Sequence, residues 1–153
     1  MTHTSALIET LRGLRNEDRE LTGNWDRVTL PRRILEAIED GKSSGLWILL
    51  KRNAATEALG STKFNVSKAS SLLDISRRTM HLWAKEFHLT KEGLNGYETE
   101  EKVRPWRDQE RDLVIVLLKK YEGDHEIISK RMGIEPKTLR SKIAYYNLRN
   151  FRT

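Results

Sequence analysis

Residues 75–89 read ISRRTMHLWAKEFHL, and the prediction of the fold starts from the helix that this stretch indicates. Ser76 is a good residue to begin a helix, because its side-chain oxygen can accept a hydrogen bond from an early backbone N–H. Arg77 and Arg78 follow in the first turn, where the helix dipole disfavours positive charge. An anionic partner lying against this helix end would turn that cost into a gain. The stretch therefore predicts a capped helix that faces a polyanion.

A second short helix is predicted immediately before this one, over residues 66–73. Only a three- to four-residue turn separates the two helices, which is the spacing of a helix-turn-helix. Asp74 lies in this turn and tolerates the positive φ that a tight turn requires. Ile75 is placed to fill the angle between the helices, and Met80 with Phe87 to bury the back of the second helix.

The same pattern recurs later in the chain. A shift of 59 places residues 64–89, the first copy, over residues 123–148, the second copy. The two copies have identical residues at Ser70 and Ser129, Ile75 and Ile134, Thr79 and Thr138, and Leu89 and Leu148. Similar residues occur at Asn65 and Asp124, Ala69 and Ile128, Leu73 and Met132, Arg78 and Lys137, Met80 and Leu139, and Phe87 and Tyr146. Asp74 and Gly133 occupy the same place in the turn. The sequence therefore predicts two helix-turn-helix units.

Both copies resemble the Fis-type helix-turn-helix, found in the factor for inversion stimulation and at the C-termini of bacterial enhancer-binding activators. In the first copy the resemblance is carried by Asn65, Ala69, Leu73, Ile75, Arg77, Thr79, Met80 and Leu89. In the second copy it is carried by Gly123, Met132, Gly133, Ile134, Thr138, Leu139, Lys142 and Leu148. It implies a bacterial DNA-binding protein whose partner is double-stranded DNA, and it explains nothing in residues 1–45.

The predicted fold is all-α, with N-terminal helices followed by two three-helix units and a short linker. The predicted segments are residues 1–45 for dimerisation or core packing, residues 46–89 for the first Fis-like unit, residues 90–104 for the linker, and residues 105–153 for the second Fis-like unit. The linker is predicted because its sequence holds two glycines and little apolar content.

Helical spacing places further elements outside the two copies. Leucines over residues 7–21 form an amphipathic stripe, which is either local core or a dimer seam. Pro31 and Pro105 are each placed to open a helix. A helix is expected over residues 46–59, with a short strand over residues 46–50 as the alternative.

Charge supports a polyanionic partner, although the net value of +6 is modest. Residues 1–60 hold nine basic and nine acidic residues, and residues 90–104 hold three and four. The excess lies in residues 61–89, with five basic and two acidic residues, and in residues 105–153, with eleven and seven. The positive charge therefore coincides with the two copies.

Composition argues against several other classes. There is no cysteine, so neither a disulfide nor a thiolate zinc site is expected. The four histidines are scattered, and no apolar run approaches the length of a membrane span. We expect a cytoplasmic, nucleoid-associated protein with no metal, cofactor or membrane contact.

The resemblance implies that the second helix of each copy enters the major groove. The expected DNA-binding residues of the first copy are Ser67, Ser76, Arg77, Arg78, Thr79, His81 and Lys85. Those of the second copy are Lys137, Thr138, Arg140, Ser141 and Lys142. Glu126 and Glu135 replace Ser67 and Ser76 there, so weaker binding or a different sequence preference is expected. Trp83, Phe87, Trp106 and Tyr146 are expected to be core residues rather than platforms for bases.

The leading hypothesis is a sequence-specific transcriptional regulator, with DNA bending implied by the resemblance. One alternative is an adaptor that binds another regulator or RNA polymerase, since residues 1–60 are neutral overall. Another is the DNA-binding part of a recombinase or transposase, which would need a catalytic constellation. Asp108, Glu110 and Asp112 lie along a helix beside Arg107 and Arg111 and are expected to be solvated pairs, so we expect no enzyme activity.

Overall fold

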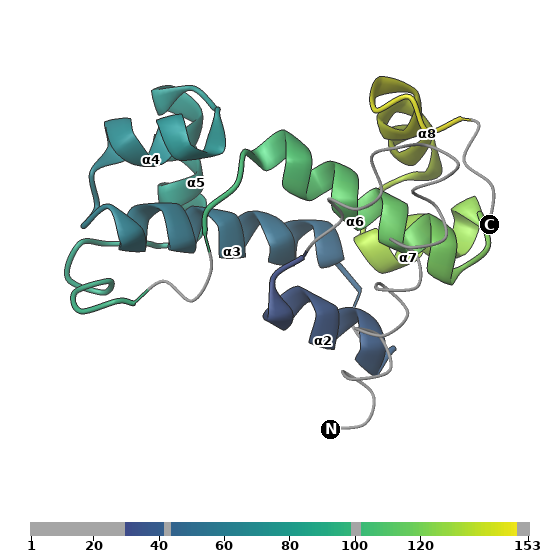
Figure 1. Cartoon of the computed structure of the whole chain (residues 1–153), viewed down its shortest axis with the longest axis horizontal. Coiled ribbons are helices and arrows are strands. Elements are labelled where there is room, and N and C mark those ends of the chain that lie inside the picture. The colour runs from purple at the N-terminus through teal and green to yellow at the C-terminus, as the bar shows by residue number, and fades with distance from the viewer. Residues whose placement is uncertain (1–29, 42–43, 99–101, 150–153) are drawn as a thin grey trace. The chain divides into compact units, whose positions relative to one another are not determined.

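The structure, a computed structural model, describes residues 30–41, 44–98 and 102–149, and every regular element in these ranges is helical. The elements are α2 (Arg32–Asp40), α3 (Leu46–Ser61), α4 (Val66–Leu73), α5 (Arg77–Glu86), α6 (Trp106–Lys120), α7 (His125–Met132) and α8 (Pro136–Tyr145) (Figure 1). The all-α prediction is confirmed, and α3 rules out the strand considered for residues 46–50. The leucine stripe of residues 7–21 lies outside the described residues.

The described residues fall into two compact units. The α4–α5 unit is Ile48–Glu110, and it contains most of α3 and the first residues of α6. The α7–α8 unit contains the described residues of Met1–Trp47 and Arg111–Thr153, so it includes α2 and most of α6. The described part of the N-terminal segment therefore shares a unit with the second copy.

The core of the α4–α5 unit is built around small residues of α3. Ala54, Ala55 and Ala58 are buried on this helix, which lets the neighbouring helices approach closely. Trp83 of α5 fills the space that these alanines leave, and its ring meets Trp106 edge to face with 5.2 Å between ring centroids. Trp83 is therefore a core residue as expected, whereas Trp106 is half-buried and packs against that core.

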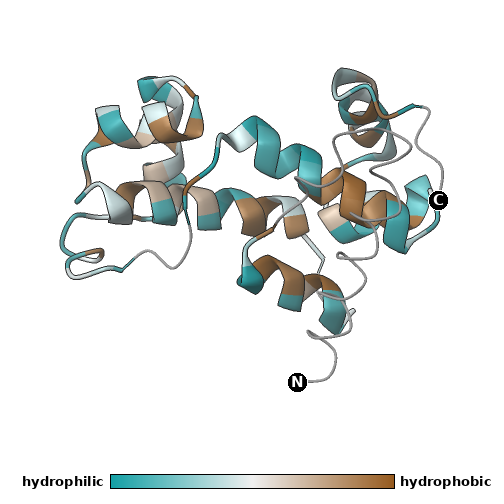
Figure 2. Ribbon diagram, viewed as in Figure 1, coloured by the Kyte–Doolittle hydropathy of each residue, from teal (hydrophilic) through white to brown (hydrophobic). Residues whose placement is uncertain are grey.

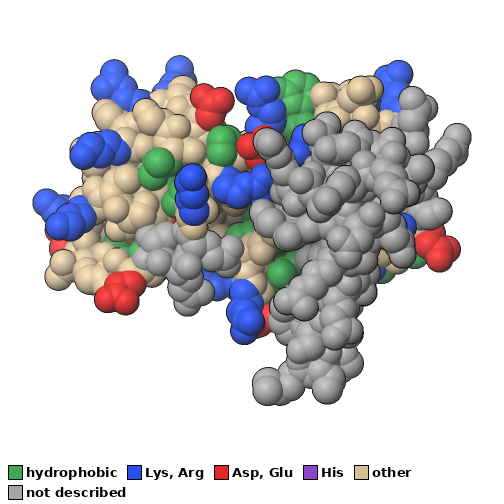
Figure 3. Space-filling view, viewed as in Figure 1, with side chains coloured by type: hydrophobic (Ala, Val, Ile, Leu, Met, Phe, Trp, Pro, Cys, Tyr) green, Lys and Arg blue, Asp and Glu red, His purple; other side chains and the backbone are tan. Residues whose placement is uncertain are grey.

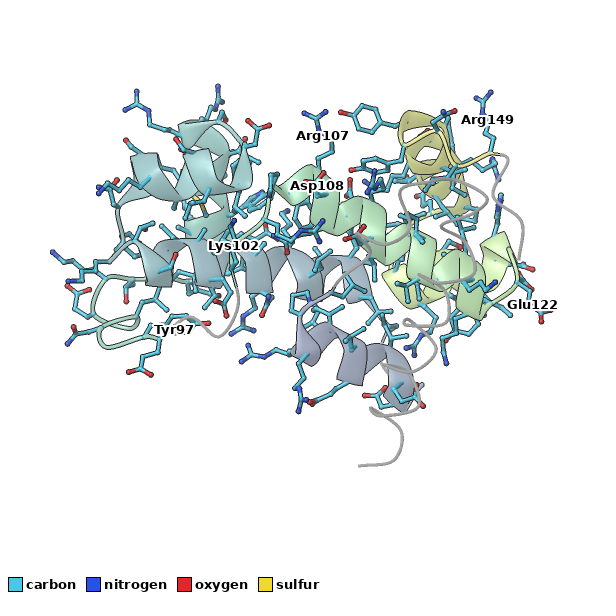
Figure 4. All side chains as sticks on the ribbon, in the orientation of Figure 1. Tyr97, Lys102, Arg107, Asp108, Glu122 and Arg149 are labelled. Carbon is cyan, nitrogen blue, oxygen red and sulfur yellow. The ribbon has the colours of Figure 1, made fainter. Side chains whose placement is uncertain are left out.

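Residues 90–98 and 102–105 contain no helix, and they pack on the α4–α5 unit. Leu94 and Val103 lie against its core. Tyr97 donates a hydrogen bond from its hydroxyl to the Glu57 carboxylate of α3, and its ring covers Gly60 (Figure 4). This segment is thus part of the folded unit as well as a connection.

The core of the α7–α8 unit is centred on the second half of α6. All six side chains from Leu113 to Leu118 are buried, so this part of the helix is covered on every face. Ile34 and Ile38 of α2 are fully buried in the same unit. Figure 2 shows hydrophobic residues along both α2 and this part of α6.

Two acidic residues of α6 correct a sequence-based expectation. Glu110 is only 6% exposed and Asp112 is fully buried, whereas both were expected to be solvated. The Arg111 guanidinium lies 3.9 Å from the Asp112 carboxylate. The neighbouring arginines indicated a solvated surface. The apolar residues that follow are buried, and this part of α6 is buried with them.

A buried arginine joins α2 to α7 within the α7–α8 unit. Arg131 is 8% exposed, and its Nη2 donates hydrogen bonds to the carbonyl oxygens of Ala37 and Ile38, both at 3.0 Å. These carbonyls belong to the last turn of α2, where the Gly41 N–H also donates to the Ile38 carbonyl at 3.4 Å. Arg131 therefore caps the C-terminus of α2 from another helix.

Replacing Arg131 by alanine should destabilise the chain by about 1–3 kcal/mol, because the carbonyl oxygens of Ala37 and Ile38 lose the hydrogen bonds that the guanidinium donates. Lys130→Ala is the matched control, since Lys130 is the exposed neighbour on α7. Urea unfolding followed by circular dichroism measures both variants. Equal midpoints for the two variants would contradict the capping role.

A second close contact in this unit involves two glycines. Gly133 ends α7 with φ +78°, and a Cβ added there would lie 2.8 Å from the Gly45 Cα. Gly41 ends α2 with a similar φ of +70°, but an added Cβ would meet nothing within 4 Å. Gly133 is thus required both by its backbone conformation and by the nearby main chain.

Gly41→Ala should therefore cost about 1–2 kcal/mol, the strain of a left-handed alanine. Gly133→Ala should cost clearly more, because the main chain at Gly45 must also shift. Thermal unfolding of the two variants measures the difference. A Gly133→Ala variant no less stable than Gly41→Ala would show that the contact with Gly45 carries no energy.

Candidate nucleic-acid interface

Short-range hydrogen bonds set the path of the chain from α4 to α5. The side chain of Asn65 caps α4 by accepting from a backbone N–H three residues on, at 3.0 Å. Asp74 ends α4 in the left-handed conformation, with φ 54° and ψ 48°. The Ile75 N–H then donates to the Ser70 carbonyl at 3.0 Å, which closes the turn. The predicted turn residue and its positive φ are confirmed.

Ser76 caps α5, as the sequence predicts. Its Oγ accepts a hydrogen bond from the Thr79 N–H at 3.0 Å and donates one to Thr79 Oγ1 at 2.8 Å. The Thr79 side chain is half-buried, and it takes part in the cap through the second of these hydrogen bonds. Arg77 and Arg78 are exposed in the first turn, which contains no acidic residue.

The outward face of α5 is predominantly cationic. Its exposed residues are Arg77, Arg78, His81, Leu82, Lys85 and Glu86. The carboxylate of Glu86 is paired with Lys51 of α3, whose Nζ lies 3.1 Å away. Met80, Trp83 and Ala84 are buried on the opposite face. Figure 3 shows Lys and Arg side chains standing out from the part of the unit formed by α4 and α5.

The beginning of α4 adds polar groups to this unit. Ser67 is exposed in the first turn of α4. It lines an open depression of about 390 Å³ together with Thr62, Lys68, Ser71 and Leu72. Hydroxyl groups, a lysine and the first backbone N–H groups of a helix are groups that hold phosphate.

The local backbone of the first copy recurs in the second copy with the predicted shift of 59 residues. Within the described residues of the two copies and the residue before each, positive φ occurs at Lys63 and Glu122, Phe64 and Gly123, Asp74 and Gly133, and His88 and Asn147. The hydrogen bond that closes the turn also recurs, from the Ile134 N–H to the Ser129 carbonyl at 3.0 Å. The two segments therefore follow the same local path.

The second copy differs at the start of its second helix. Glu135 occupies the N-cap position of α8 and makes no capping hydrogen bond with its side chain. Lys137, Thr138, Arg140 and Ser141 are exposed on this helix. Four of the five residues expected to contact DNA in this copy are therefore accessible.

Lys142, the fifth, is less accessible than the other four. It is half-buried, and its Nζ lies 4.9 Å from the centre of the Trp47 ring. The shift of 59 aligns it with the buried Trp83. At the position that matches the buried Ala54, α6 carries the larger Leu113, which is also buried. Lys142 thus differs in burial from the four exposed residues of α8.

Two exposed residues were missed by the sequence analysis. Leu82 is 56% exposed on the cationic face of α5, and Tyr145 is 69% exposed on α8. The helical period could have identified Leu82, because it is four residues from Arg78 and three from Lys85.

Other kinds of site are not evident in the described part of the chain. Among those residues, no group of three or more His, Asp or Glu side chains is placed to hold a metal ion. No helix there has the length and apolar composition needed to cross a bilayer.

Exchanging the cap residues tests how the two second helices begin. Ser76→Ala should destabilise the chain by about 1 kcal/mol, because α5 loses its side-chain cap. Glu135→Ser should stabilise it by up to about 1 kcal/mol, since α8 gains one. Both changes are measured by urea unfolding. Shifts of the same sign in the two variants would show that the N-cap positions are not equivalent.

Comparison with known proteins supports the first copy. The family described as bacterial regulatory protein, Fis family, matches residues 56–82, which span the end of α3, all of α4 and most of α5. No similar protein was found among curated sequences, and none among solved structures. The geometry and this match together identify residues 56–82 as a helix-turn-helix of the Fis type, the kind of module with which bacterial regulatory proteins bind DNA.

Proposed function

We propose that this chain is a sequence-specific DNA-binding regulator of transcription, and that α5 enters the major groove. The observation that carries the proposal is the exposed cationic face of α5 within a helix-turn-helix that matches the Fis family. In this role the protein binds double-stranded DNA and catalyses no reaction. Association with the bacterial nucleoid and bending of the bound duplex belong to the proposal on the strength of the resemblance alone.

The charges at the start of α5 favour this partner. A positive residue near a helix N-terminus costs about 0.3–1 kcal/mol, whereas a bidentate contact from arginine to guanine contributes about 1–3 kcal/mol of discrimination. Arg77 and Arg78 therefore gain more from base edges and phosphates than they lose to the dipole. Lys85 lies two turns further along the helix, where a phosphate contact is expected.

We further propose that α6, α7 and α8 form a second unit of the same type. Support comes from the recurrence of the turn, the positive φ values and the hydrogen bonds 59 residues later. Lys137 and Arg140 supply exposed cations on α8, but Glu126 and Glu135 stand where the first copy has serines. The α4–α5 unit should thus contribute more of the DNA affinity than the α7–α8 unit, and the two units should prefer half-sites of different sequence.

The two cations of α5 should have different effects on binding. Arg77→Ala should cost about 1–3 kcal/mol and relax the preference at one base pair, whereas Lys85→Ala should weaken all duplexes alike and lower the salt slope by about one. Lys102→Ala is the control, because Lys102 is exposed but lies outside α4 and α5 (Figure 4). Fluorescence anisotropy at several salt concentrations measures these effects.

Selection of duplexes from a random library by the full-length chain tests the proposal as a whole. A split motif is expected, with Arg77→Ala altering one half and Arg140→Ala altering the other. A single half-site affected only by Arg77→Ala would remove the second unit from DNA recognition. No enriched motif, with binding lost at moderate salt, would leave nonspecific electrostatic binding and favour the adaptor.

A further inference from the structure

We infer that Leu82 recognises the C5-methyl group of a thymine and so fixes one A·T pair in the half-site of the α4–α5 unit. This inference rests on the proposed function, because it requires α5 to lie in the major groove. It adds to the proposed function a preference for one base pair. The residue responsible is uncharged, so the pattern of positive charges does not identify it.

The position of Leu82 is the first step of the argument. It is 56% exposed and lies on α5 between Arg78 and Lys85 in the helical spacing that places all three on one face. The residues that α5 contributes to the core are Met80, Trp83 and Ala84, on the opposite face. Leu82 thus points away from the core.

Exposure alone carries little weight, because single exposed leucines are common on protein surfaces. The surrounding charge is more informative. Arg78 and Lys85 flank Leu82 on this face and are exposed, while the nearby Glu86 carboxylate is paired with Lys51. A partner that covers Leu82 must therefore accept several cations and also offer an apolar group at the centre of the contact.

The major groove meets both requirements. Phosphates and guanine edges accept the cations, and the thymine methyl is the apolar group that base edges present there. Cytosine and uracil lack this methyl, so a leucine against it favours thymine at one position. The equivalent residue of the second copy is the exposed Ser141, so the inference applies to the first unit alone.

Removing the methyl group from DNA tests the contact. In the selected duplex, each thymine is replaced singly by deoxyuridine, and the dissociation constant of the full-length chain is measured by anisotropy. One replacement, in the half that responds to Arg77→Ala, should weaken binding about fourfold, the ratio that corresponds to burial of one methylene-sized group. Leu82→Ala should bind the two duplexes equally.

Leu72→Ala is the matched control, because Leu72 is also an exposed leucine, 39% accessible on α4, and should keep the fourfold difference. Leu82→Ser, which installs the residue of the second copy, should abolish the difference as alanine does. Circular dichroism establishes that each variant is folded. If one variant fails to fold, the other provides the same comparison.

The possible outcomes separate this inference from the proposed function. Selective binding without any thymine that is sensitive to loss of its methyl would overturn the inference and leave the proposed function intact. A sensitive thymine whose effect persists in Leu82→Ala would also overturn it. If the chain binds no duplex selectively, both the inference on Leu82 and the proposed function are wrong. Unchanged DNA binding by Leu82→Ala, together with reduced self-association in sedimentation, would assign Leu82 to a protein contact instead.

Discussion

A left-handed residue at the end of α4 sets the geometry of the helix-turn-helix at residues 56–82, and the same conformation recurs 59 residues later at the end of α7. Positive φ at Asp74 and at Gly133 reverses the chain within one residue, and the next N–H then closes the turn. This fixes where the second helix begins and therefore which of its faces is buried. Aspartate suffices at Asp74, but Gly133 also lies against the main chain at Gly45, which leaves no room for a side chain.

The two units follow the same local backbone path but carry side chains of different size at matching positions. The α4–α5 unit has alanines on its first helix and a tryptophan on its last, whereas α6 carries larger aliphatic residues at the matching positions. Lysine rather than tryptophan then stands at position 142, close to the Trp47 ring. The backbone path is thus similar in both units, although different helices supply the large side chains of the core.

Charge separates the units further. Serines stand at the start of both helices of the first copy, and one of them caps α5 with a hydrogen bond. Glutamates take both places in the second copy, where their charge would repel a phosphate, and Glu135 leaves α8 without a side-chain cap. Stability and DNA affinity should therefore change together at position 135. If both units bind DNA, most of the affinity should come from α5.

Features that depend on neighbours a few residues away could be predicted from the sequence. The helix positions, the Ser76 cap, the turn at Asp74 and the 59-residue register all arise from side chains and backbone groups close together in the chain, so local patterns predict them. The exposed residues of α5 were largely predictable for the same reason.

Features that depend on contacts between distant residues could not be predicted from local patterns and are seen first in the folded chain. Arg131 caps a helix whose carbonyl oxygen belongs to a residue 94 positions earlier, and Tyr97 bonds to Glu57 from 40 positions away. Burial of Asp112, the placement of Lys142 and the packing of residues 90–98 on the α4–α5 unit follow from such contacts. Short-range periodicity contains no information about which distant helix will cover a given face, because that depends on how the volumes of separate segments fit together.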